Sequence, residues 1–438
     1  MRAMVLRHQG TVGEGLLQLD ERPVPSPGPG QVLLRIRACG VCHTDLHLCE
    51  GELPPRPLPI VPGHEVVAEV AELGPGVGPD LGLTPGRRVG LAWLHESCGQ
   101  CRFCRTGREN LCPHIRFTGY DADGGYADYV LAPAGSVHPL PERYSDTEAA
   151  PLLCAGIIGW RAIRRADVRP GERVGLMGFG ASAHLVLQVL VAWGCEVAVY
   201  TRGETHRRLA GNLGAAWAGG YAERAPWALE RALVFTPAGE TVVHALGCLD
   251  SGGVVAIASV HLSTIPPLDH DRLLLGEREV RSVTAATRED AASFLALASR
   301  VPLRVHTEEY PLAEAEAVLA RLKAGRVDGA AVLVRPDDAV RLDPQDVGEE
   351  VVAGCEREVP NRGAYTKGHP GALLVRNAHE AARGTMTPDD VLVELRYVDD
   401  LVRGRRRGGD PLVVRRGHYR FLAVVVALRT TPACTAPR

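Results

Sequence analysis

The fold of this chain follows from residues 172–201, ERVGLMGFGASAHLVLQVLVAWGCEVAVYT. The run 172–180 predicts a buried strand, 183–193 predicts an apolar helix, and 195–201 predicts a second strand. Strand–helix–strand units of this kind build a parallel sheet with helices on both faces. The stretch therefore predicts a doubly wound α/β domain.

The turn inside this stretch has the pattern G-x-G-x-x-A, formed by Gly178, Gly180 and Ala183. The first glycine permits a tight turn, and the second lets a pyrophosphate approach the backbone. The small third residue allows close packing of helix on sheet, with the phosphates at the helix N-terminus. Because the motif follows a predicted strand and opens a predicted helix, it predicts dinucleotide binding rather than an ordinary glycine-rich turn.

The end of the second predicted strand indicates which dinucleotide binds. An acidic residue there would bind the ribose 2′-hydroxyl of NAD, but this chain has Thr201-Arg202. No carboxylate repels a 2′-phosphate, and a guanidinium can pair with it in bidentate fashion. NADP is therefore favoured over NAD. The alternative is a solvated Arg202, with NAD bound through Glu204 or the backbone.

The sequence on either side predicts a second domain. Residues 1–150 contain short β-like runs cut by Pro and Gly, which is typical of a small barrel-like β domain with long loops. The strand–helix alternation occupies 151–287, and β-rich texture returns over 288–335 around one predicted helix, LAEAEAVLARLKAG. We expect a discontinuous β domain with the α/β domain inserted into it.

Residues 336–438 lose this organisation and contain charge runs such as RGRRR and few periodic segments. Two alternatives stay open for this C-terminal extension. It is either a small fused domain or an appended or out-of-frame tail that forms no stable core. No function is assigned to it.

Composition excludes several classes of protein. A net charge of −3 offers no electrostatic footprint for nucleic acid or an anionic membrane. No run approaches the roughly 18–20 apolar residues of a membrane span, and the start, MRAMVLRHQG, does not resemble a signal peptide. We expect a cytoplasmic protein whose 12 cysteines are thiols and metal ligands rather than a disulfide framework.

Four cysteines lie close together in the segment 95–113: Cys98, Cys101, Cys104 and Cys112. Four thiolates at C-x2-C-x2-C-x7-C spacing suit a tetrahedral zinc ion with every position filled. Bacterial iron–sulfur proteins use a similar pattern, but their last gap is about three residues and no second cluster motif occurs here. The spacing predicts a structural zinc that stabilises a lobe without its own core.

A second set of metal-binding residue types is spread over the N-terminal part. The segments CGVCHTDLH, PGHE and PLLCAG offer Cys39, Cys42, His43, Asp45, His47, His64, Glu65 and Cys154. Each residue alone has an ordinary structural explanation. One Cys, one His and one further Cys from separated segments would form the open three-ligand set of a catalytic zinc, leaving a position for water or substrate.

The order of these motifs resembles that of the zinc-containing alcohol dehydrogenases of the medium-chain dehydrogenase/reductase superfamily. The likeness spans about residues 1–335 and includes GVCHTDLH, PGHE, the four-cysteine lobe, DGGYADY and the glycine motif. It implies a GroES-like β-barrel catalytic domain joined to a Rossmann cofactor domain. It also implies assembly as a homodimer or homotetramer.

The resemblance further implies two zinc ions per chain. Cys42, His64 and Cys154 correspond to the ligands of the catalytic zinc, and the four-cysteine lobe to the structural zinc site. Glu65 matches a carboxylate that can approach the catalytic metal during ligand exchange. Asp45 matches the acid that orients the zinc-bound histidine.

The remaining matched positions concern protons, cofactor and substrate. Thr44 matches the group that accepts the alcohol proton, which passes through the cofactor ribose to His47. His43 matches a position that helps to bind the pyrophosphate. Trp93 matches an aromatic residue that narrows the substrate pocket, although plain core packing would also explain it.

We therefore expect an enzyme that transfers a hydride between a small primary alcohol, or its aldehyde, and NAD(P). An alternative with the same fold is a dehydrogenase for another alcohol class, such as polyols or cinnamyl-type alcohols. An alternative of a different class is a non-catalytic, zinc-stabilised binding protein, which predicts one zinc ion per chain.

Overall fold

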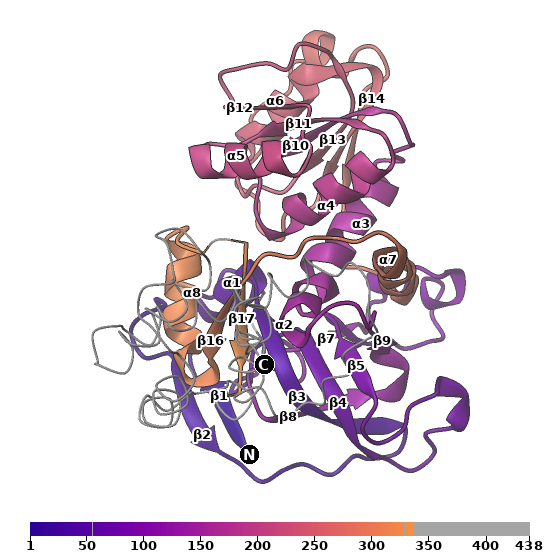
Figure 1. The fold of residues 1–438 in the computed structure, drawn as a ribbon, viewed down its shortest axis with the longest axis vertical. Helices are drawn as coiled ribbons and strands as arrows, with labels where there is room; N and C mark the ends of the chain where they lie inside the picture. Colours follow the sequence, from indigo (N-terminus) through magenta and orange to yellow (C-terminus); the bar gives the residue numbers. More distant parts are fainter. Residues whose placement is uncertain (55, 328, 336–438) are drawn as a thin grey trace, which may run out of the picture. The chain divides into compact units, whose positions relative to one another are not determined.

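Two large sheets organise the part of the chain that the computed structural model describes, residues 1–54, 56–327 and 329–335 (Figure 1). The C-terminal extension predicted over 336–438 lies outside these residues.

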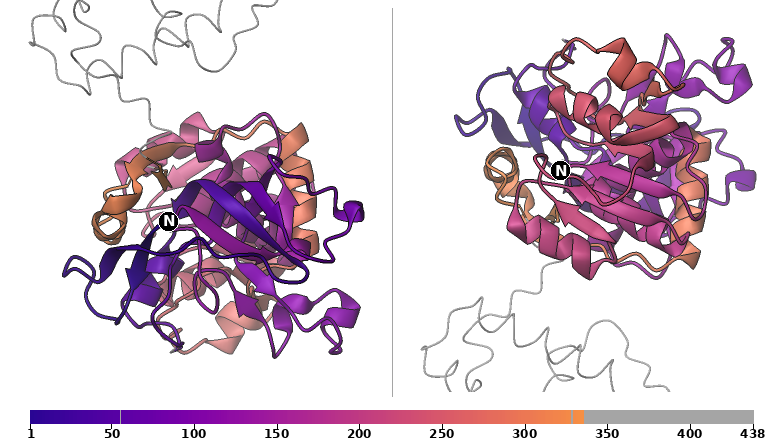
Figure 2. Two further views of the ribbon diagram at one scale, coloured as in Figure 1. Left: turned by 90° about the horizontal axis from the view of Figure 1, so that it is seen from below. Right: turned by 90° about the horizontal axis from the view of Figure 1, so that it is seen from above.

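The N-terminal sheet has the strand order β16-β17-β3-β4-β5-β9, with β8 also paired to β3. Its strands are β3 (Gln31–Val41), β4 (Glu65–Leu73), β5 (Arg88–Leu91), β8 (Tyr129–Pro133), β9 (Val137–Pro139), β16 (Thr307–Pro311) and β17 (Ala330–Val334). Neighbours pair antiparallel except β16 and β17. In Figures 1 and 2 the orange segment that ends the described chain accordingly lies beside the indigo strands.

The long strand β3 holds this sheet together. Its first half pairs with β8, its last residues pair with β17, and β4 covers its other edge. The pair β1 (Arg2–Leu6) and β2 (Leu17–Glu21) is attached through the bridges Ala3–Ala127 and Leu6–Ile60. One apolar core, containing Leu34, Val66 and Leu91, fills the interior, as expected for a barrel-like domain.

The second sheet is entirely parallel and has the order β12-β11-β10-β13-β14-β15. Its strands are β10 (Arg173–Met177), β11 (Glu196–Tyr200), β12 (Trp217–Gly219), β13 (Leu229–Val234), β14 (Leu249–Ile257) and β15 (Glu279–Ser282). The reversal of strand order beside β10 is the doubly wound topology. The predicted Rossmann fold class is confirmed.

Helices cover both faces of the parallel sheet. They are α3 (Ala155–Arg165), α4 (Ala181–Ala192), α5 (Glu204–Asn212) and α6 (Glu240–Cys248). Helix α7 (Arg288–Arg300) packs instead against α3 and β9. On one face, Leu176 of β10 shares a core with Val186 of α4 and Ile163 of α3. On the other face, Met177 shares a core with Leu246 of α6. Burial on both faces explains why β10 is a continuous apolar run.

Helix α7 corrects the expectation that residues after 288 return directly to β structure. Thr287 and Asp290 form a capping box at its start. Ala291, Phe294 and Leu295 then repeat at helical spacing and are buried. The helix forms because this short amphipathic period and its cap outweigh the β-like composition of the surrounding segment.

The other elements are short and mostly connect the sheets. They are α1 (His43–Cys49), α2 (Asp146–Ala149), α8 (Ala315–Lys323), β6 (Leu94–Glu96), β7 (Arg116–Phe117), η1 (Pro79–Leu81), η2 (Cys104–Thr106), η3 (Glu109–Leu111), η4 (Ala134–Ser136), η5 (Pro151–Leu153), η6 (His270–Leu274) and η7 (Leu312–Glu314). Within the described residues, every helix is too short or too polar to cross a bilayer.

The buried imidazole of His138, on β9, makes stability depend on pH. Burial, helped by the charge of Arg288, lowers its pKa from the usual 6.5 to about 4. Between these values the unfolded chain binds a proton that the folded chain does not, so the free energy of unfolding should fall as the pH falls. The loss at this residue is at most about 3 kcal/mol.

In His138→Gln, the decline between pH 6.5 and 4 should be shallower than in the wild type, as measured by urea denaturation. A parallel measurement at pH 8 isolates any packing effect of the substitution. Equal slopes for the two proteins would contradict this assignment.

Candidate functional site

The end of β3 leads directly into the first group of candidate residues. Cys42 follows the strand in an extended conformation and is the N-cap of α1. Its backbone N–H donates to Oδ2 of Asp45 at 3.0 Å. Asp45 thus caps the helix and fixes the turn that carries the Cys42 side chain.

The structure brings Cys42, His64 and Cys154 together from three separate segments. Sγ of Cys42 lies 3.8 Å from Sγ of Cys154, and Nε2 of His64 lies 3.3 Å from the same sulfur. With a carboxylate oxygen of Glu65, these ligand atoms all lie within 4.8 Å of one another. Ligands of a tetrahedral zinc ion are separated by roughly 3.3–3.8 Å, so the donor set fits zinc.

Electrostatics in this group favour a thiolate. The hydrogen bond from Cys154 holds the pKa of the Cys42 thiol well below its usual value, and His64 acts in the same direction against the effect of burial. The same contact, together with burial, raises the pKa of Cys154. The thiolate is the form of cysteine that binds metals.

Asp45 fixes the orientation of His64. Its Oδ1 lies 3.1 Å from Nδ1 of His64 and also accepts a hydrogen bond from the Gly63 backbone N–H at 3.2 Å. Tyr126 donates its hydroxyl to the other carboxylate oxygen at 3.2 Å. Because Nδ1 is engaged by the carboxylate, Nε2 is directed at the sulfurs, which is how a second layer of residues orients a metal-binding histidine.

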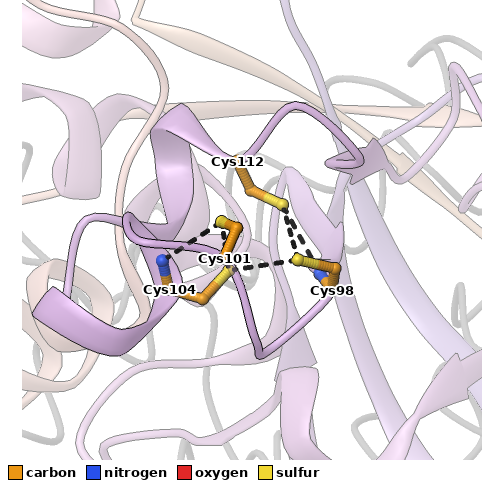
Figure 3. Close-up of side chains that lie close together, drawn as sticks. All are labelled: Cys98, Cys101, Cys104 and Cys112. Atoms are coloured by element: carbon orange, nitrogen blue, oxygen red, sulfur yellow. Dashed lines mark hydrogen bonds between the residues drawn. The ribbon is translucent and has the colours of Figure 1, made fainter.

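The four-cysteine lobe forms a second group of sulfurs, which point toward one another in Figure 3. The Sγ atoms of Cys101 and Cys104 are 3.5 Å apart, as are those of Cys98 and Cys112. These separations exceed a disulfide bond of about 2.05 Å and suit a tetrahedral ion. Backbone amides donate to two of the sulfurs, and amides of Gln100 and Cys101 lower the pKa of Cys98 to about 6.

The residues of the glycine motif lie at the carboxyl end of β10. Gly178 has φ +93°, and a Cβ there would lie 2.7 Å from Cγ2 of Thr236. Gly180 is the N-cap of α4 without a side-chain cap, and a Cβ at this position would meet open space. Ala183 is fully buried against the sheet. The free helix N-terminus and its open approach fit a pyrophosphate.

The residues expected to read the ribose follow β11. Thr201 is buried, whereas Arg202 is exposed. Glu204, which the alternative assignment would use, begins α5 and lies 3.8 Å from the guanidinium of Arg207. Thr201 also accepts a backbone-oxygen hydrogen bond from Nε of Arg207 at 3.3 Å. Arg202, rather than Arg207, is therefore the exposed cation at the end of β11.

Comparisons with known proteins agree with this geometry. Residues 28–142 match the family described as "Alcohol dehydrogenase GroES-like domain". A protein of Mycobacterium tuberculosis (strain CDC 1551 / Oshkosh) named "Probable alcohol dehydrogenase AdhA" is 50% identical over 336 residues, which are 76% of this chain and 97% of the relative. The chain belongs to the zinc-type alcohol dehydrogenases of the medium-chain dehydrogenase/reductase superfamily.

Two further similarities cover the same region of this alcohol dehydrogenase family member. An alcohol dehydrogenase of Geobacillus stearothermophilus is 36% identical over 74% of this chain and 96% of its own length. The solved structure of acetophenone reductase from Geotrichum candidum NBRC 4597 in complex with NAD has a TM-score of 0.69 at 26% identity, covering 77% of this chain and 98% of the other.

The residues matched to the family's proton relay lie along α1. Thr44 is buried, and its Oγ1 lies 3.7 Å from Sγ of Cys42. The half-buried His47 contacts Glu52 through Nδ1, and its ring lies 5.4 Å from that of His261 and 6.4 Å from that of His43. Sequence reasoning missed Glu52 and His261, because no motif marks either contact.

Three aromatic side chains, Trp93, Phe117 and Tyr120, form an aromatic wall that lines one side of the first metal-binding group of this family member. The edge of the Trp93 ring meets His64 with centroids 4.8 Å apart. Phe117 stacks on Trp93 at 4.7 Å, and Tyr120 stacks at 5.8 Å. Phe117 and Tyr120 were not predicted. Their position just before the DGGYADY motif was the only signal in the sequence.

Gly40, on β3, makes room for the carboxylate of this alcohol dehydrogenase site. A Cβ at Gly40 would lie 1.9 Å from Oε2 of Glu65, which is buried and whose pKa burial raises well above the usual value. Gly40→Ala should therefore displace Glu65 and lower the free energy of unfolding by about 1–3 kcal/mol, measured by urea denaturation.

Gly135→Ala is the matched control, because nothing lies within 4 Å of a Cβ built there. Its stability should stay near that of the wild type. A Gly40→Ala protein as stable as this control would show that the carboxylate moves at no cost.

Proposed function

We propose that this protein is a zinc-dependent alcohol dehydrogenase that transfers a hydride between a small primary alcohol and NAD(P), with aldehyde reduction as the reverse reaction. The convergence of Cys42, His64 and Cys154 supports this function most directly. Two soft sulfurs and an imidazole with a neighbouring carboxylate form a catalytic rather than a closed structural zinc set. In this proposal each chain binds two zinc ions.

The chain's own residues orient the site and move the proton. When bound, zinc supplies Lewis acidity toward the alcohol oxygen, and the nicotinamide supplies the hydride acceptor. Asp45 holds His64 in the orientation needed to bind metal. The hydroxyl of Thr44 accepts the alcohol proton as it releases its own toward His47, and His47 passes that proton to the surface, where Glu52 stabilises the positive charge.

The aromatic wall bears on the substrate. Trp93, Phe117 and Tyr120 stack into a rigid apolar surface beside His64. Such a surface favours an apolar alcohol over a polyol, whose hydroxyl groups would lose hydrogen bonds against it. Small primary alcohols and aldehydes are thus the first substrate class, and cinnamyl-type alcohols the second.

We also propose NADP as the preferred cofactor, because Arg202 is exposed after β11. The division into a catalytic domain of residues 1–150 and 288–335 and a cofactor domain of 151–287 is part of the same proposal. So is assembly as a homodimer or homotetramer. A cytoplasmic location stays a prediction.

Removing one ligand of each proposed zinc site tests the function. Cys154→Ala should abolish alcohol oxidation and lower the zinc content from two to one per chain while the protein stays folded. Zinc would be measured by mass spectrometry, and initial rates with ethanol and benzyl alcohol using both cofactors.

Cys101→Ser is the matched substitution in the four-cysteine lobe. It should also remove one zinc ion but mainly lower the melting temperature. Full activity of Cys154→Ala would contradict the assignment of Cys154 to a catalytic zinc site. One zinc ion per chain and no alcohol oxidation in the wild type would instead support the non-catalytic binding protein.

The cofactor preference has its own test. Arg202→Ala should raise the Michaelis constant for NADP+ about tenfold or more, because a charge-assisted contact to the 2′-phosphate is lost. The constant for NAD+ should change little. Equal changes for both cofactors would leave the preference for NADP without support.

A further inference from the structure

The hydroxyl of Tyr221 is buried and finds no hydrogen-bond partner among the residues that the structure describes. Tyr221 lies two residues after the end of β12, at the carboxyl end of the parallel sheet. In a doubly wound sheet, ligands bind at this end of the strands. A buried polar group without a partner costs stability, so its presence at this end of the sheet requires an explanation.

Packing alone does not require the hydroxyl. The Tyr221 ring stacks on Tyr200 with centroids 6.4 Å apart and meets the ring of His244 edge-on at 5.5 Å. A phenylalanine could make both contacts. The neighbouring hydroxyl of Tyr200, by contrast, accepts a hydrogen bond from the Ala225 backbone N–H at 3.2 Å and is explained by the fold.

The surroundings of Tyr221 connect it to the predicted cofactor residues. The ends of β11 and β12 lie side by side, because the Thr201 backbone N–H donates to the Gly219 backbone oxygen at 2.9 Å. Burial raises the pKa of the Tyr221 hydroxyl to about 12. Gly178 donates its N–H to the backbone oxygen of Tyr200 at 2.9 Å. Arg202 and Tyr221 therefore follow the ends of neighbouring strands, and the first glycine of the fingerprint is bonded to the end of one of them.

Arg202 is the cation available for a ligand on this edge. The neighbouring Arg207 is shared between Glu204 at 3.8 Å and Glu223 at 3.9 Å. Within the described residues, no carboxylate lies within 4.0 Å of Arg202 as an ion-pair partner. An anionic group arriving here would find one unneutralised guanidinium and one unused phenolic donor.

We propose that Tyr221 is a specificity-determining residue whose hydroxyl, together with Arg202, recognises the 2′-phosphate of the adenosine half of NADP. This inference rests on the proposed preference for NADP. The phosphate oxygen accepts the hydrogen bond that the fold leaves unmade, so the cost of the buried hydroxyl is recovered only when the phosphorylated cofactor binds.

The test measures binding of two adenosine fragments to the full chain by calorimetry, without turnover. The probes are adenosine 2′,5′-bisphosphate and adenosine 5′-monophosphate, which differ only in the 2′-phosphate. Tyr221→Phe should weaken the bisphosphate about tenfold or more and the monophosphate less than about twofold. The unliganded variant should melt no lower than the wild type, because no hydrogen bond within the chain is removed.

A double-mutant cycle with Arg202→Ala adds a second readout. If both groups contact one phosphate, the double variant should lose less affinity for the bisphosphate than the two single losses combined. Tyr310→Phe is the control, since its hydroxyl contacts Glu308 on β16 in the other sheet. It should leave both affinities unchanged.

Two outcomes would overturn the inference, and they are distinguishable. If the wild type prefers the bisphosphate and Tyr221→Phe keeps that preference, the role of Tyr221 fails while the proposed use of NADP stands. If the wild type binds both probes equally, the preference for NADP fails and the role of Tyr221 fails with it. Neither result depends on alcohol oxidation.

Discussion

The buried carboxylate of Asp45 organises the candidate active site. It accepts hydrogen bonds from the backbone N–H groups of Cys42 and Gly63, from the Tyr126 hydroxyl and from the His64 ring. A carboxylate in such a setting is stable only when its oxygens are satisfied by donors. These hydrogen bonds therefore fix the end of β3, the start of α1 and the segment before β4 relative to one another. The positions of the metal-binding atoms depend on these hydrogen bonds.

The two groups of sulfurs play different physical parts. The four-cysteine lobe contains only short 3-10 turns, so its shape depends on ligands converging at one point. It is tied to the rest of the chain by Asn110, which donates to the Thr284 backbone oxygen at 2.8 Å, and by Glu109, which accepts from the Arg288 backbone N–H at 2.8 Å. The lobe thus contacts the start of α7, the helix that composition alone did not predict.

The features that could be predicted from the sequence are those determined by residues close together in the chain. Three such features could be recognised in the sequence because each depends on only a few neighbouring residues. They are the α/β alternation, the glycine turn at Gly178 and the spacing of the four cysteines. The capping box at Thr287 is equally local, but the helix that it begins was not predicted, because β-like texture was expected over the whole of 288–335. Phe117, His261 and Tyr221 were missed for a different reason. Their contacts join segments far apart in the chain, and no spacing rule describes such contacts.

The choice between Cys39 and Cys42 shows where sequence information ends. The residues alone established a zinc-binding alcohol dehydrogenase pattern, because thiols, imidazole and the glycine fingerprint occur in a family-specific order. Spacing alone gave both cysteines of CGVC similar standing. Pairing of β3 with β4 and β17 buries Cys39 within the sheet, where burial raises its pKa. Cys42 falls just beyond the last paired residue, and its sulfur therefore meets Cys154. The family resemblance pointed to Cys42, and strand register, a long-range property, supplies the physical reason.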